Sequence, residues 1–108
     1  MAFTALHNIS SATDGEEVEL IAAGDNASNI KSILLTNVDT AAITVDLYIY
    51  DASTDTRYHL LFGTSLPVGA SLLLDSNDML AFNNSVNSFS LNIKLGSTSD
   101  LINVLIKR

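Results

Sequence analysis

Cysteine and tryptophan are absent from this 108-residue chain, proline occurs once, and lysine and arginine together number only 5. The absence of cysteine excludes disulfides, thiolate metal sites and a cysteine nucleophile. The chain has 12 Asp and Glu, many more than its basic residues, which gives a formal net charge of -7. Nucleic acid and an anionic membrane surface would both repel so acidic a chain, so neither is expected as a direct partner.

Long hydrophobic runs are also missing. No apolar stretch reaches the roughly 18 residues of a membrane-spanning helix, and the opening residues lack the charge and apolar run of a secretory signal. Yet 47% of the residues are hydrophobic and only 16% are charged, which excludes intrinsic disorder. The length leaves room for one domain with one core.

The dominant pattern is alternation of apolar and polar residues, which is typical of half-buried β-strands. It is clearest over 42–51, and further strands are predicted over residues 3–9, 17–22, 29–37, 57–62, 71–74, 79–82, 89–95 and 101–106. Residues 79–82 could instead form a single helical turn. The segment 29–37 is apolar on both faces, so we expect it to be central in its sheet. Asn, Asp, Gly and Ser separate these runs at a spacing of roughly 8 to 12 residues.

These patterns predict an all-β antiparallel β-sandwich of about eight strands, jelly-roll or immunoglobulin-like, with negligible helix. Residues 1–10 are expected to be an N-terminal arm or edge strand, and 11–108 the single sandwich domain. The predicted core consists of the inward-facing residues Ile33, Leu35, Val45, Leu47, Ile49, Leu60, Phe62, Leu91, Ile93 and Leu105.

Catalytic and metal-binding signatures do not occur in the sequence. His7 and His59 have no second histidine or carboxylate at a metal-ligand spacing, and there is no G-x-S-x-G elbow. The acidic loops 51–55 and 75–78 lack the glycine and distal glutamate of an EF-hand, so Asx-rich turns explain them better. We therefore predict a protein that is not an enzyme, with no catalytic residue, metal or cofactor.

The most informative cluster comes from pairing the strands on either side of the turn 52–55. Tyr50 then faces Arg57 and Tyr48 faces His59, which places a mixture of aromatic and arginine side chains on the outer face of a hairpin. Such mixtures are typical of protein interfaces, although ordinary cross-strand pairing, including a cation–π contact between Tyr50 and Arg57, explains them equally well. An aromatic platform beside an acidic residue would also suit a glycan.

The segment 3–9 contains neither proline nor glycine and could add as a strand to a neighbouring subunit's sheet. Phe3 and Leu6 are its candidate contact residues. If the segment pairs with a neighbouring subunit, we expect removal of the first ten residues to reduce the stability of the assembly more than the stability of the domain.

Four segments in this order, 29–37, 42–51, 57–61 and the Pro-x-Gly-x-Ser approach to the apolar strand at 66–75, resemble small β-sandwich virion proteins of tailed bacteriophages. The resemblance covers about the middle half of the chain and implies a capsid decoration protein, or a neck or tail component, made in the host cytoplasm. The implied partners are further copies of the chain, expected as a trimer, and the major capsid or another virion protein. A small glycan-binding β-sandwich is the alternative from a different class.

Overall fold

The structure is a computed structural model that describes residues 5–15, 17–22, 30–76, 80, 82, 89–97 and 100–107. Within these residues the chain forms eight strands and one four-residue helical turn. In chain order they are β1 (Ala5–Ser10), α1 (Ser11–Asp14), β2 (Glu17–Ile21), β3 (Ser32–Asn37), β4 (Ile43–Asp51), β5 (Thr56–Leu66), β6 (Ser71–Leu74), β7 (Phe89–Leu95) and β8 (Leu101–Lys107). The predicted all-β architecture with negligible helix is confirmed.

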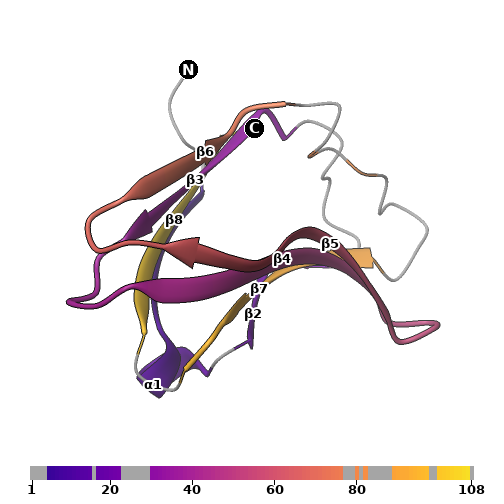
Figure 1. Cartoon of the computed structure of the whole chain (residues 1–108). Coiled ribbons are helices and arrows are strands. Elements are labelled where there is room, and N and C mark those ends of the chain that lie inside the picture. The colour runs from indigo at the N-terminus through magenta and orange to yellow at the C-terminus, as the bar shows by residue number, and fades with distance from the viewer. Residues whose placement is uncertain are drawn as a thin grey trace.

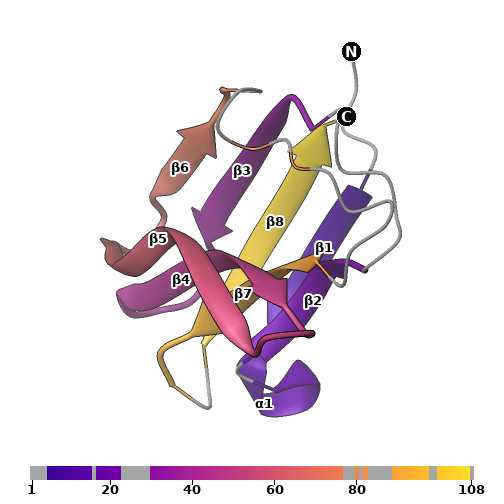
Figure 2. The ribbon, with the colours of Figure 1, turned by 90° about the vertical axis from the view of Figure 1, so that its right-hand side faces the viewer.

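The strands form two four-stranded sheets in which every pairing is antiparallel. The order is β1-β8-β3-β6 in one, called sheet A, and β2-β7-β4-β5 in the other, called sheet B. Figure 1 shows the sheets as two layers, and Figure 2 shows the strands of sheet A side by side. This strand order is that of a jelly roll, and it places β3 inside its sheet, as predicted.

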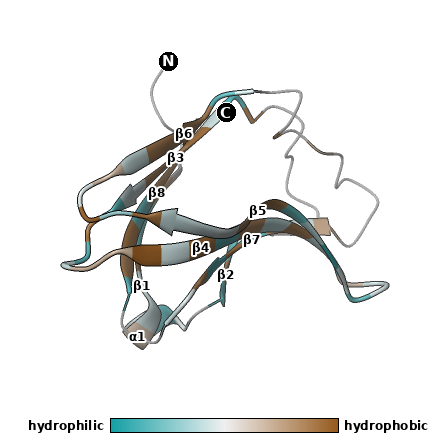
Figure 3. Ribbon diagram, viewed as in Figure 1, coloured by the Kyte–Doolittle hydropathy of each residue, from teal (hydrophilic) through white to brown (hydrophobic). Residues whose placement is uncertain are grey.

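The core lies between the two sheets. Six of the predicted core residues are fully buried, and Ile49 and Leu60 are partly buried against them; the six are Ile33, Leu35, Val45, Leu47, Leu91 and Ile93. Hydrophobic residues recur along the strands of both layers (Figure 3). The alternation of apolar residues therefore identified the inner face of β3, β4 and β7 correctly.

Phe62 was predicted to be in the core, and that prediction was wrong, because its side chain is 76% exposed. The pairing of β4 with β5 follows the predicted register beside the turn and then shifts, so that Leu47 pairs with Leu61 and Val45 with Thr64. Each extra residue in β5 is a β-bulge, and one inserted residue moves the following side chain to the opposite face. Phe62 consequently lies on the outside of sheet B.

Leu105 was also predicted to be in the core and instead lies on the outer face of sheet A. In β8 the buried residues are Ile102, Val104 and Ile106, and Leu105 has the opposite orientation and is only half-buried. The apolar residues of this strand occupy both faces, so period-two alternation does not by itself distinguish inside from outside.

The predicted N-terminal arm and the predicted strand over 79–82 differ in how much of each the structure describes. Ala5–Ser10 of the expected arm is the edge strand β1, paired with β8 over six residues, and Ile9 is buried. The predicted strand over 79–82 falls partly outside the described residues, and Leu80 is buried there in a helical conformation. No helix among the described residues is long and apolar enough to cross a membrane.

Candidate interaction surface

The predicted hairpin cluster forms on the outer face of sheet B. Tyr48 pairs with His59 and Tyr50 with Arg57, as the sequence predicted, so these four residues lie together at the tip of β4 and β5. Of the other two predicted contact residues, Leu6 lies on sheet A and Phe3 lies outside the described residues. The six candidates therefore do not form one continuous surface.

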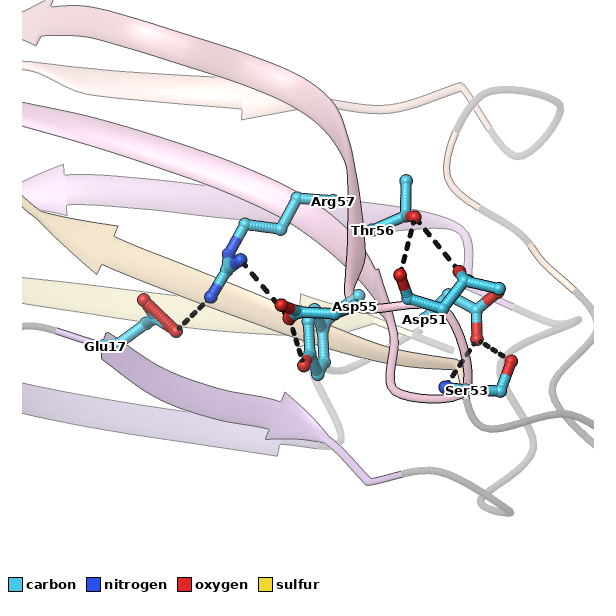
Figure 4. Close-up of polar contacts among 8 residues, drawn as sticks. Glu17, Asp51, Ser53, Asp55, Thr56 and Arg57 are labelled. Carbon is cyan, nitrogen blue, oxygen red and sulfur yellow. Dashed lines mark hydrogen bonds and ion pairs between the residues drawn. The ribbon is translucent and has the colours of Figure 1, made fainter.

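Arg57 is the residue that holds this cluster together. The central carbon of its guanidinium lies 5.0 Å from the ring centre of Tyr50 and 5.6 Å from that of Tyr48. Its nitrogens approach Glu17 Oε1 at 3.4 Å and Asp55 Oδ1 at 3.8 Å (Figure 4). The nearby Tyr48 hydroxyl and Glu17 carboxylate raise the pKa of Arg57 above its ordinary value. Because Glu17 belongs to β2, at the opposite edge of the sheet from β5, the cluster links both edges of sheet B.

Tyr48 lies beneath these side chains and is only 1% exposed, so it is not presented to a partner as the sequence suggested. Its ring packs against His59 at a centroid distance of 5.3 Å. The Tyr48 hydroxyl and Asn92 Oδ1, from the paired position on β7, are buried without a hydrogen-bond partner among the described residues. Burial is the main cause that raises the pKa of Tyr48, and Glu17 adds to it. Tyr48 is thus a packing residue on the outer side of the sheet.

The turn at the hairpin tip is fixed by Asp51 and Asp55. Asp51 Oδ1 accepts hydrogen bonds from the backbone N–H and the hydroxyl of Ser53 at 3.0 and 2.7 Å, and Oδ2 accepts one from Thr54 at 3.0 Å. The Ser53 hydroxyl is the main cause that lowers the pKa of Asp51. Tyr50 donates its hydroxyl proton to Asp55 Oδ1 at 2.7 Å, which raises the pKa of Tyr50. These carboxylates are thus used within the turn, as expected for an Asx-rich loop.

Phe62, which the sequence reasoning assigned to the core, is the most exposed large apolar residue of sheet B. The next residue, Gly63, has a φ of 60°, a conformation that favours glycine, and its N–H donates to Asp46 Oδ1 at 2.6 Å. The Phe62 ring meets His59 edge-on at 4.9 Å. A glycine directly after an apolar strand residue was the available signal for this bulge.

The outer face of sheet A has a different character. One leucine from each strand lies in register across it, and these four residues, called the leucine row, are Leu6, Leu105, Leu34 and Leu73 in the order β1, β8, β3, β6. Leu6 is 71% exposed and Leu73 is 53% exposed, and the two inner leucines are half-buried. A polar row runs beside it, formed by Asn8, Asn103, Thr36 and Ser71.

Concave features lie at the end of the sandwich where the loop 38–42 lies near Gly96, Ser97 and Asp100. The larger is an open depression of about 420 Å³ bordered by Asp39, Thr44 and Asp100, with no aromatic residue in its described lining. Asp39 accepts a hydrogen bond from the N–H of Thr40, and Asp100 accepts two from Ser97. The described residues contain no group of three or more histidine or acidic side chains placed to hold a metal ion.

No model of a known protein family and no curated protein sequence matches the chain. Among solved structures, the Anabaena sensory rhodopsin transducer aligns with a TM-score of 0.43 and 15% identity, over 81% of this chain and 74% of that one. The infectious bursal disease virus VP2 subviral particle aligns with a TM-score of 0.44 and 14% identity, over 96% of this chain and 32% of that one. The chain thus spans about a third of the VP2 chain.

Proposed function

We propose that the protein is a non-enzymatic structural component of a bacteriophage virion, a capsid decoration protein that acts through protein–protein contacts. The order of sequence segments supports this proposal, and so does the jelly-roll strand order, an architecture that viral capsid proteins use repeatedly. Because one fold serves many functions, the argument rests on the surface rather than on the architecture.

The observation that carries the proposal is the presentation of Phe62. The large aromatic side chain of Phe62 is exposed to solvent. Its direction is fixed by the bulge in β5, by the positive φ of Gly63 and by the hydrogen bond from the Gly63 N–H to Asp46. In the neighbouring cluster, Arg57 contacts Tyr48, Tyr50 and Glu17 of its own chain, so the cluster forms a packed base beside the ring. Aromatic residues on a firm base are the usual anchors of protein interfaces, where they enter a pocket of the partner.

Particle binding tests this role directly. Virus particles assembled without the protein are mixed with the purified chain, and the bound fraction is measured by co-sedimentation. Phe62→Ser should weaken binding at least about tenfold with an unchanged unfolding temperature, because an exposed side chain contributes little to folding. Val68→Ser is the matched control, since Val68 is 57% exposed on the turn between β5 and β6.

Electron microscopy of the native particle separates the alternatives. Density for the chain on the capsid lattice supports a decoration protein, and density at the neck or tail assigns it there instead. Absence of the chain from purified particles would refute the proposal. In that case a rise of the unfolding temperature with added oligosaccharide would support the glycan-binding alternative.

A further inference from the structure

The leucine row places two exposed and two half-buried aliphatic side chains in one line across the outer face of sheet A. It spans all four strands of sheet A, and the direct cross-strand pairs Leu6–Leu105, Leu105–Leu34 and Leu34–Leu73 place the four side chains on the same face. Leu6 and Leu73, on the two edge strands, are the most exposed members. Scattered single leucines on a surface need no explanation, but a continuous row across a sheet marks an interaction site.

The charge around the row indicates what kind of surface can cover it. None of the described strand residues on the outer face of sheet A is acidic, although the chain has 12 Asp and Glu; the face consists of Leu6, Asn8, Ser10, Ser32, Leu34, Thr36, Ser71, Leu73, Leu101, Asn103, Leu105 and Lys107. The outer face of sheet B, in contrast, carries Glu17, Glu19 and Asp46. A second copy of a chain with net charge -7 would therefore meet no carboxylate from these strands on sheet A.

The row is also self-complementary. Consider a two-fold axis that lies parallel to the face, midway between two copies, and passes over the point between Leu105 and Leu34. The leucine row of one copy then lies against the leucine row of the other, whether the axis runs along the strands or along the row. Such matching is what an isologous interface between identical subunits requires. Two sheets can stack about 10 Å apart in this way, as they do inside a β-sandwich.

The area of the outer face of sheet A agrees with a weak but specific dimer. The four strands have 6, 7, 6 and 4 residues, which at about 3.3 Å per residue and about 4.8 Å between strands give a face of about 360 Å² in projection. Accessible surface exceeds projected surface because side chains stand out from the sheet. Two copies would then bury about 700 Å² in projection and more as accessible surface, in the size range of weak and transient pairs.

We infer that the outer face of sheet A is a self-association surface, on which a second copy of this chain packs its own leucine row. The inference does not depend on the role in a virion. It gives two-fold symmetry, which differs from the trimer expected from the sequence resemblance.

Sedimentation velocity of the isolated chain between about 1 and about 500 μM tests the inference, because interfaces at the small end of the size range belong to weak and transient pairs. A monomer–dimer equilibrium is expected, and it should strengthen with added salt, which screens repulsion between two acidic copies. Leu73→Glu should weaken it at least about tenfold, since it places a carboxylate on the row of each copy. Val68→Glu is the matched control at an exposed apolar residue on the turn between β5 and β6 and should leave the equilibrium unchanged, and circular dichroism checks that both variants fold.

Cross-linking locates the surface independently. Because the chain contains no cysteine, Leu105→Cys introduces a single thiol close to the centre of the row. A short bismaleimide should link two copies of this variant efficiently and two copies of Val68→Cys only at the rate of random collision.

Several results would overturn the inference: a monomer at every concentration, a trimer as the only assembly, or a dimer that Leu73→Glu leaves intact. Equal weakening by Val68→Glu would also overturn it, because general surface hydrophobicity would then drive the association. If the isolated chain is monomeric and Leu73→Glu abolishes particle binding, the face docks on a different virion protein and self-pairing is refuted.

Discussion

The outer faces of the two sheets differ in whether their side chains find contact partners within the same chain. On sheet B, Arg57 contacts two tyrosines and two carboxylates of its own chain, and Tyr48 is buried beneath it. On sheet A, aliphatic side chains of four strands lie in a row with polar neighbours and no acidic residue among the described strand positions. The face whose composition is typical of an interface therefore uses its aromatic and charged groups internally.

This difference shows that composition alone is a poor guide to a binding surface. Tyrosine and arginine are enriched at interfaces because they offer both apolar area and hydrogen bonds, but the same properties let them satisfy one another within a sheet. Leucine has no polar group to satisfy. When it lies exposed in register with other leucines, burial against another surface is the only stabilisation left to it.

The largest loss of stability is expected on the inner side of sheet B, and a much smaller one on the outer side of sheet A. Leu47→Ala removes a fully buried side chain and should lower the free energy of unfolding by about 2 to 5 kcal/mol. Leu105→Ala removes a half-buried side chain from the leucine row and should cost only about 1 kcal/mol. Chemical denaturation measures both, and equal losses would contradict the assignment of Leu105 to the outer face.

A smaller effect should come from the bulge that turns Phe62 outward. Asp46→Ala removes the carboxylate that accepts the Gly63 N–H and should cost about 1 to 2 kcal/mol, less than a fully buried charged hydrogen bond because Asp46 is partly exposed. Asp46→Asn keeps an acceptor oxygen at the same position and should cost less than half as much. If denaturation shows Asp46→Ala to be neutral, this hydrogen bond does not stabilise the bulge.

The sequence predicted the fold well where one face of a strand is consistently apolar. In β4, Thr44 and Asp46 separate the buried aliphatic residues Ile43, Val45 and Leu47, so alternation identified both the strand and its inner face. In β8 the alternation is obscured, and only Asn103 and Lys107 show that Leu105 shares a face with polar residues. Phe62 was misplaced because a bulge adds a residue without changing the apolar character of the strand.

The candidate surfaces were less predictable because they depend on strand order. The pairing of Tyr50 with Arg57 follows from a single turn and was predicted correctly. The contact between Arg57 and Glu17 requires the order β2-β7-β4-β5, and the leucine row requires the registers of four strands whose connections differ widely in length. Neither order nor register of sequentially distant strands can be read from local alternation.

A still smaller effect, of opposite sign, is expected beneath the Arg57 cluster. Tyr48→Phe removes a buried hydroxyl that has no hydrogen-bond partner among the described residues, so it should be neutral or stabilise the protein by up to about 1 kcal/mol. Tyr50→Phe instead removes the hydrogen bond to Asp55 and should destabilise the hairpin slightly. Thermal unfolding compares the two, and a clear loss of stability in Tyr48→Phe would show that its hydroxyl interacts favourably with Glu17, Arg57 or Asn92, the groups that, together with burial, shift its pKa.

The smallest effect concerns the inner side of sheet A, where His7 of β1 pairs with Val104 of β8. The Nε2 atom of His7 is buried without a partner among the described residues, and burial lowers the pKa of His7 below its ordinary value. The unfolded chain then binds more protons than the folded one between these two pKa values, so stability should be complete above about pH 7 and should decrease as the pH falls through about 6.5. Denaturation between about pH 5 and about pH 7.5 should show this slope. His7→Gln should reduce the slope, and His59→Gln, which leaves His7 in place, should retain it; the same slope in His7→Gln as in the natural chain would assign the proton uptake to other groups.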